Sequence, residues 1–239
     1  MEKKSSHINY ISELRKRVLA IIVFFVMALI VGGIFSKKLI LMFLNTNLPT
    51  NVNLVTLNPY ENISLFIHFM FFVAIALTIP FLFYQIIKYV SPSLTKKEKK
   101  LAITIPFVAL ILFILGSGLG YLMIKYLIVP FLSNLALSIE VVNNWSINQY
   151  MKFVIYFSLT MGLIFQIPWI ILLFVKFNLL KPKQINKSRK YVIIGLFILA
   201  ALVTPPDLFS LIVMVLPLVI LFEITLIIAR LIKRKERNK

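Results

Sequence analysis

The chain has 239 residues, of which 60% are hydrophobic and only 14% are charged. Soluble domains average about half apolar and about a quarter charged residues, so this composition excludes an ordinary water-soluble enzyme and intrinsic disorder. Cysteine is absent and His7 and His68 are the only histidines, so we expect no disulfide framework, no metal site and no cofactor. The formal net charge of +18 is compatible with a nucleic-acid-binding protein or with a membrane protein. The positions of the basic residues along the chain distinguish between these two classes.

Long apolar stretches predict an all-α integral membrane protein that forms a single polytopic domain of residues 1–239. A hydrocarbon core of about 30 Å requires about 20 mainly apolar residues in a helix. None of the predicted spans has Lys or Arg at its centre, where a charge is costly. The six predicted transmembrane helices cover residues 18–35, 63–87, 101–124, 151–175, 191–203 and 208–229, with the longest outer loops at 36–62 and 125–150.

The fifth span, residues 191–203, is short, because 13 residues of helix cover only about 20 Å. A re-entrant segment is the alternative. We keep a span because the charge pattern requires six crossings, and a short helix can thin the bilayer locally or be shielded by its neighbours.

Prolines inside or at the ends of the spans predict kinked helices and a concave bundle. Neighbouring helices in a membrane can satisfy the carbonyls that a proline leaves unbonded. These residues are Pro80, Pro106, Pro168 and Pro217.

The basic residues alternate between segments. The amino terminus, loops 88–100 and 176–190 and the carboxyl tail together hold 22 Lys and Arg, against 4 in the other connections. The positive-inside rule therefore places both termini in the cytoplasm, or in the stroma or matrix of an organelle. Because this topology signal explains the charge, we expect no nucleic-acid partner, while anionic membrane lipid remains a plausible contact.

Two acidic residues lie among the basic residues of this inner side. Glu13 precedes the first span, and Glu98 stands among four lysines. The simpler interpretation is a solvated carboxylate that balances its neighbours. The functional interpretation is a carboxylate that binds a cationic ligand, most effectively a guanidinium held by two hydrogen bonds.

Gln166 and Glu223 are polar residues inside the fourth and sixth spans, and both are expected in the inner half of the membrane. An ionisable group at that depth is a functional candidate, although helix packing is an equally good explanation. For His68 and Gln85 in the second span, packing is the preferred explanation.

The outer turn before the sixth span has the pattern of a helix cap. Thr204 fits the N-cap, Pro205 the first helical position, Pro206 follows, and Asp207 completes a capping box. Gly116, Gly118 and Gly120 lie inside a span with no strand before them, so close helix packing is expected rather than a phosphate loop.

Taken in order, the motifs resemble those of the TatC family of twin-arginine translocase subunits over nearly the whole chain. The matching elements are ELRKR at 13–17, PYE at 59–61, YQ at 84–85, YVSPSL at 89–94 with Glu98, FQIP at 165–168, RKY at 189–191, TPPDLFS at 204–210, Pro217 and FEI at 222–224.

The resemblance implies six helices in a glove-like arrangement with both termini inside. It implies a receptor that binds twin-arginine signal peptides and exports folded proteins with the proton-motive force. The implied partners are TatA/TatB-type single-span subunits and further copies of the chain. The implied location is a bacterial cytoplasmic membrane or a thylakoid, plastid or mitochondrial inner membrane.

The resemblance also assigns residues. Glu13 and Glu98 would receive the two signal arginines, and Arg15 and Tyr89 would shape that site. Gln166 would be the polar group of the cavity with Glu223 beside it, and Asp207 would lie in the outer turn.

The chain departs from the family at several positions. Tyr10, Leu211 and Tyr126 replace the His, Gln and Pro that are common there, and Gln166 is neutral where many members carry Glu. A small secondary transporter that uses Glu223 and Gln166 is the alternative function, although no inverted repeat of discontinuous spans is apparent. A purely structural assembly factor is a third possibility.

Overall fold

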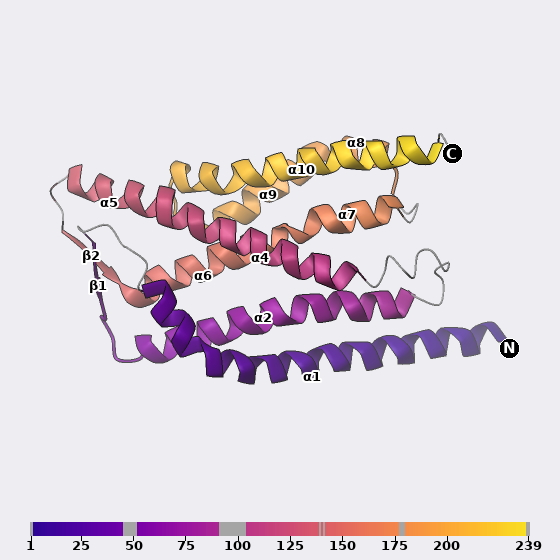
Figure 1. Ribbon diagram of the computed structural model, residues 1–239, viewed down its shortest axis with the longest axis horizontal. Coiled ribbons are helices and arrows are strands. Elements are labelled where there is room, and N and C mark those ends of the chain that lie inside the picture. The colour runs from indigo at the N-terminus through magenta and orange to yellow at the C-terminus, as the bar shows by residue number, and fades with distance from the viewer. Residues whose placement is uncertain are drawn as a thin grey trace. The chain divides into compact units, whose positions relative to one another are not determined.

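The computed structural model describes residues 2–44, 52–90, 104–138, 140, 142–176 and 180–237, with side chains from Ser12 onward in the first of these ranges. The chain divides into two compact units. The first unit comprises Met1–Thr46 and Asn62–Ile111, and the second comprises Asn47–Glu61 and Leu112–Lys239. Both are predominantly helical, which confirms the predicted fold class (Figure 1).

The first unit is built on two long antiparallel helices, α1 (Glu2–Leu44) and α2 (Glu61–Val90) (Figure 1). Aromatic rings join them, because Phe24 stacks on Phe81 with ring centroids 4.2 Å apart. At Gly32 the helices approach so closely that an added Cβ would lie 2.6 Å from the Met70 carbonyl oxygen. A glycine is therefore required at this crossing.

Helix α1 continues eight residues beyond the predicted outer-loop start at residue 36. Figure 1 shows that it changes direction before it ends. The Ser36 hydroxyl donates a hydrogen bond to the Gly33 carbonyl oxygen at 2.7 Å, and glycine and serine are residues at which helices bend.

The third predicted span is longer than expected. Helix α4 (Ile105–Met123), a π-helical turn (Ile124–Ile128) and α5 (Val129–Ser138) form one helical segment, so much of the predicted loop 125–150 is helix. The wide π turn ends two residues before Pro130, which has no backbone N–H to donate. The helix continues through this proline.

A two-stranded parallel sheet joins the two connections that the sequence predicts as outer loops, and the sequence did not predict this sheet. Strand β1 (Val52–Val55) pairs with β2 (Asn143–Ser146), with Val52 opposite Asn143 and Val55 opposite Ser146. Ser146 also starts α6 (Ile147–Ile164), because its hydroxyl oxygen accepts a hydrogen bond from the Gln149 N–H at 3.2 Å. The fourth span thus begins four residues before its predicted start.

The fourth span is broken near Pro168. Helix α6 ends at Ile164, and α7 (Gln166–Lys176) begins after Phe165. Pro168 removes the hydrogen bond to the Ile164 carbonyl, and its ring crowds that group. A break is therefore confirmed here, whereas α2 and α10 continue through Pro80 and Pro217 and Pro106 lies in the first turn of α4.

Helices α4 and α6 pack through glycines, as predicted for this glycine-rich stretch. An added Cβ on Gly162 would lie 2.3 Å from the Ser117 hydroxyl oxygen and 2.7 Å from the Phe113 ring. On Gly116 it would lie 2.7 Å from the Phe165 ring, whereas on Gly118 it would meet nothing within 4 Å. Of the three predicted glycines, Gly116 and Gly120 (with an added Cβ 3.0 Å from Met161) therefore have a packing role, and Gly118 does not.

The remaining helices of the second unit are α8 (Pro182–Lys187), α9 (Arg189–Val203) and α10 (Leu208–Arg237). A buried apolar cluster holds them against α7 and contains Val175, Ile185, Phe222, Leu226 and Ala229. Five helical segments of the described chain are long and apolar enough to cross a membrane. With 15 residues, α9 is the short fifth segment that the sequence predicts.

Candidate functional site

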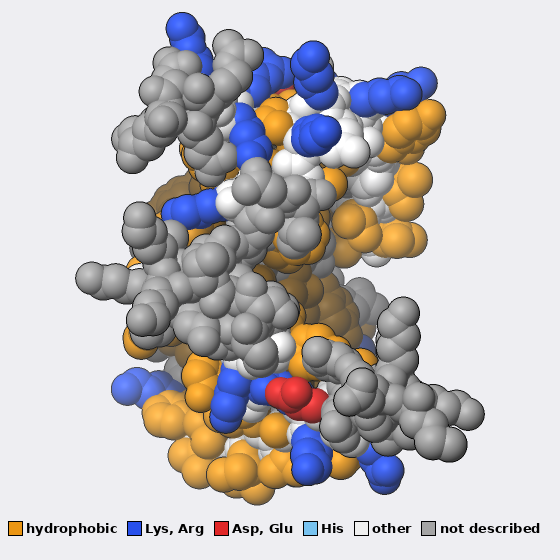
Figure 2. Space-filling view, turned by 90° about the vertical axis from the view of Figure 1, so that its right-hand side faces the viewer, with side chains coloured by type: hydrophobic (Ala, Val, Ile, Leu, Met, Phe, Trp, Pro, Cys, Tyr) orange, Lys and Arg blue, Asp and Glu red, His pale blue; other side chains and the backbone are white. Residues whose placement is uncertain are grey.

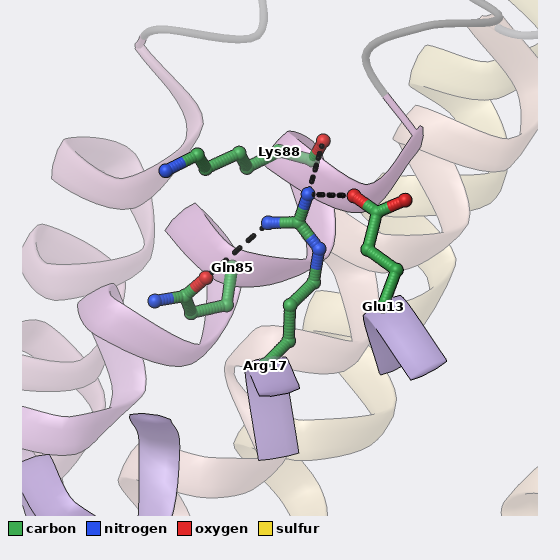
Figure 3. A network of polar contacts seen from close by, with 4 residues as sticks. All are labelled: Glu13, Arg17, Gln85 and Lys88. Atoms are coloured by element: carbon green, nitrogen blue, oxygen red, sulfur yellow. Dashed lines mark hydrogen bonds and ion pairs between the residues drawn. The ribbon is translucent and has the colours of Figure 1, made fainter. Parts of the chain in front are cut away.

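A guanidinium held between α1 and α2 is the centre of the candidate site in the first unit. Arg17 pairs with Glu13 one helical turn earlier, because residues four apart share one face of a helix. Its Nη2 donates to the Lys88 carbonyl oxygen at 3.1 Å, and its Nη1 donates to Gln85 Oε1 at 3.4 Å (Figure 3). The guanidinium carbon lies 5.9 Å from the centroid of the Tyr89 ring. We call these five residues the Arg17 cluster.

The end of α2 explains the position of this cation. The last carbonyls of a helix have no partner within the helix and carry partial negative charge. Lys88 lies two residues before α2 ends at Val90, and its carbonyl accepts from Arg17. Arg17 therefore caps α2 from α1.

The two charges of the cluster differ in their exposure. The Arg17 side chain is 13% exposed, whereas the Glu13 side chain is 40% exposed. Only one Glu13 oxygen is paired with Arg17, and Figure 3 shows the other pointing away from the guanidinium. The carboxylate can therefore be approached while the guanidinium is enclosed.

The structure brings together part of the predicted site. Glu13 and Tyr89, which the resemblance assigns to the signal-peptide site, both contact Arg17, whereas Arg15 is exposed. Glu98 lies outside the described residues. Arg17 and Gln85 were not assigned to the site, and the four-residue spacing of Glu13 and Arg17 is the signal that could have indicated their ion pair.

Glu223 is paired with a cation. Its Oε1 lies 2.6 Å from Arg189 Nε, which links α10 to the first residue of α9 in the second unit. The side chains are 32% and 50% exposed, respectively. Glu223 therefore forms an interhelical ion pair with Arg189. Because this pair engages the carboxylate, it argues against Glu223 as the substrate site of a transporter.

Gln166 is buried at the break between α6 and α7. Its Nε2 donates to the Gly162 carbonyl oxygen at 3.3 Å. Gly162 lies in the last turn of α6, where carbonyls lose their helical partners. Gln166 therefore bonds to the end of the helix that precedes it.

The predicted cap of the sixth span is wrong in its details. Thr204 ends α9 instead of starting α10, because its N–H and its hydroxyl both donate to the Ala200 carbonyl oxygen, at 2.9 and 3.0 Å. Asp207 is the N-cap, and its Oδ1 accepts from the Ser210 N–H at 2.7 Å. A residue before proline avoids the helical conformation, so Pro205 and Pro206 delay the start of α10 to Leu208.

A buried carboxylate of the second unit, that of Glu61, was not given a role from the sequence. Glu61 is 4% exposed and accepts hydrogen bonds from the Ser146 hydroxyl and the Leu57 N–H, both at 3.1 Å. It joins the turn before α2 to the end of β2. The PYE motif was the signal that could have identified it.

Among the coloured side chains that Figure 2 shows, Lys and Arg outnumber Asp and Glu. In the first unit the last turn of α2 contains Lys88, and in the second unit the last turns of α7 and α8 contain Lys176 and Lys187. Within the described part of the chain, no three His, Cys, Asp or Glu side chains are grouped as a metal site would require.

Comparison with known proteins agrees with these features. The family model for Sec-independent protein translocase protein (TatC) matches residues 9–217. The chain is 32% identical over 233 residues to TatCy of Bacillus subtilis, covering 98% of this chain and 92% of that protein. It is 29% identical over 237 residues to TatC of Escherichia coli K12, covering 97% and 91%.

A solved structure supports the same relationship. A crystal structure described as the twin-arginine translocase receptor TatC matches with a TM-score of 0.83 and 26% identity, covering 94% of this chain and 99% of that one. The family match extends over most of the chain, from ELRKR to Pro217. The chain therefore belongs to the TatC family of Sec-independent protein translocase proteins, which are integral membrane proteins.

Proposed function

We propose that this chain is the receptor that recognises twin-arginine signal peptides for export. The observation that carries the proposal is the Arg17 cluster, a set of groups that suits a guanidinium. It combines a carboxylate, an amide oxygen, a helix-end carbonyl and an aromatic face. Each of these favours a planar cation that donates several hydrogen bonds.

A receptor for a dibasic peptide needs local carboxylates, because the chain as a whole repels cations with its net charge of +18. Glu13 presents a carboxylate that is 40% exposed and takes one signal arginine. Glu98 takes the other, and the exposed Arg15 shapes the approach. The apolar part of the signal peptide then contacts the apolar helix walls.

The proposed topology places both termini on the cytoplasmic side of a bacterial cytoplasmic membrane. The 22-to-4 distribution of Lys and Arg supports it. We further propose that the chain acts with TatA/TatB-type single-span subunits and other copies of itself, and that the proton-motive force drives transport. In this proposal Gln166 and Asp207 stabilise helix ends, and Glu223 stabilises the contact between α9 and α10.

Peptide binding tests the proposal directly. The full chain in lipid nanodiscs is titrated with a twin-arginine signal peptide and with the same peptide carrying two lysines. We expect the lysine peptide to bind at least about tenfold more weakly, because an ammonium cannot form two parallel hydrogen bonds to a carboxylate. Equal affinity for the two peptides would refute arginine recognition.

The second carboxylate is tested in the same assay. Glu98→Gln should weaken binding of the arginine peptide about tenfold or more, in the range for hydrogen bonds to charged groups. The matched control is Glu140→Gln, an exposed acid in an outer connection, which should leave the affinity unchanged. Equal effects of the two variants would remove Glu98 from the site.

A further inference from the structure

The guanidinium site at the end of α2 already contains a guanidinium, that of Arg17. Its two terminal nitrogens reach Glu13, Gln85 and the Lys88 carbonyl, and its carbon lies 5.9 Å from the centre of the Tyr89 ring. These are the groups that the proposed function offers to an arginine of the signal peptide. The resting site is therefore occupied by a residue of the chain itself.

The hold on Arg17 is incomplete. The bond from Nη1 to Gln85 is 3.4 Å long, beyond the usual 2.7 to 3.2 Å range for such bonds. The Nε atom is buried and has no hydrogen-bond partner among the described residues. A buried donor without a partner costs free energy, so this arginine is retained less firmly than a fully bonded one.

Exposure indicates how an exchange can begin. Glu13 is 40% exposed and has one oxygen directed away from Arg17, so an incoming guanidinium can reach the carboxylate first (Figure 3). Arg17 is 13% exposed and sits on the same helix, so it competes as a tethered ligand at high effective concentration.

We propose that Arg17 is an internal competitor that occupies the signal-arginine site at rest and is displaced when a signal peptide binds. The inference rests on the proposed function and adds regulation to it. The apparent affinity for the peptide is lowered by the fraction of receptors in which Arg17 holds the site. Weak or incorrect peptides, which cannot displace Arg17, are rejected.

Removing the competitor tests the proposal. Arg17→Gln should tighten binding of the twin-arginine peptide about two- to tenfold, because the peptide no longer competes for Glu13, Gln85 and the Lys88 carbonyl. Lys16→Gln is the matched control, since Lys16 is an exposed neighbour with the same charge. Unchanged or weaker binding by Arg17→Gln, or equal tightening by both variants, would overturn the proposal.

A measurement on the unaltered chain covers the case in which Arg17→Gln does not fold. Phenylglyoxal labels accessible arginines, and mass spectrometry reads each position. Without peptide, Arg17 should react slowly and the exposed Arg234 quickly. The twin-arginine peptide should raise Arg17 labelling at least about twofold relative to Arg234, whereas continued protection of Arg17 in the complex would overturn displacement.

The two proposals fail in different ways. If the unaltered chain does not prefer the arginine peptide over the lysine peptide, the receptor function itself is wrong. If that preference is present but Arg17 stays protected or its removal does not tighten binding, only the internal competitor is wrong.

Discussion

Two pairs of carboxylate and guanidinium groups, one in each unit, show how the same chemistry serves different ends. In the first unit the guanidinium of Arg17 is the enclosed partner, at 13% exposure, and the Glu13 carboxylate is open at 40%. In the second unit Arg189 is the open partner, at 50%, and the Glu223 carboxylate is less exposed at 32%. In the first unit the carboxylate is the more exposed partner and can receive an external cation, whereas in the second unit it is the less exposed partner and links two helices of its own chain.

The surroundings of the two pairs reinforce this difference. Arg17 meets the carbonyl at the end of α2, an amide oxygen and an aromatic ring. Arg189 is the first residue of α9 and reaches α10 beside the apolar cluster that contains Phe222. The lesson is that a carboxylate in this membrane protein must be classified by its partner and its exposure, and not by its depth alone.

The largest expected effect is the difference in peptide affinity between a variant of Glu13 and a variant of Glu223. Glu13→Gln should weaken binding of a twin-arginine peptide about ten- to hundredfold, because it removes about 1.5–3 kcal/mol of charged hydrogen bonding. Glu223→Gln should leave the affinity within about twofold, because that carboxylate faces Arg189. Titration of both variants in nanodiscs with the peptide measures the two affinities. A comparable loss of affinity from Glu223→Gln would show that the two carboxylates do not differ in their role.

Gly162 tests whether the second unit depends on tight packing. Gly162→Ala should destabilise the fold by about 1–3 kcal/mol, since the new methyl group would overlap Ser117 and Phe113. Gly118→Ala is the control, because its added methyl meets nothing within 4 Å and favours a helix. Thermal unfolding of the two variants in the same detergent gives the difference, and equal stability would show that α4 and α6 can separate freely.

Asp207 is a third carboxylate, and it caps α10 by accepting a hydrogen bond from the Ser210 N–H. Asp207→Ala should cost about 0.5–2 kcal/mol, the range for an N-cap, whereas Asp207→Asn should retain most of that stability. Thr204→Ala should cost about 0.5–1.5 kcal/mol through its lost hydrogen bond to Ala200. Protein yield and unfolding temperature measure these effects. A loss of stability from Thr204→Ala far above that from Asp207→Ala would indicate that Thr204, and not Asp207, is the N-cap of α10.

The smallest effect is expected for the interhelical ion pair of Arg189 and Glu223. Glu223→Gln and Arg189→Gln should each destabilise the chain by about 0.2–1 kcal/mol, because a partly exposed ion pair contributes little. The exchanged pair, Arg189→Glu with Glu223→Arg, should recover part of the loss. Unfolding of the single and double variants gives the coupling, and additive losses would show that the two charges do not stabilise each other.

The apolar pattern predicted the helices because each span depends on local composition. It failed in the two predicted outer loops, where Lys37 and Lys38 continue α1 and Pro130 is accommodated after a π turn. The pairing of β1 with β2 joins segments about ninety residues apart, and the polar sequence of β2 has no alternating apolar pattern that would indicate a strand.

The site was predictable only in part, for a similar reason. Motifs pointed to Glu13 and Tyr89, whereas the pairing of Glu13 with Arg17 was not predicted, although residues four apart share one face of a helix. The contact from Arg17 to Gln85 spans 68 positions, and that from Arg189 to Glu223 joins two different helices. Such contacts depend on how helices pack, which hydropathy and motif spacing do not specify.

A double-mutant cycle between receptor and peptide tests the central claim most directly. Glu13→Gln is combined with lysine in place of each signal arginine in turn, and the four affinities of each cycle are measured. If Glu13 binds a signal guanidinium, one of the two lysine substitutions should lose most of its effect in the Glu13→Gln receptor. Fully additive losses at both arginines would contradict the claim that this open carboxylate receives the signal peptide.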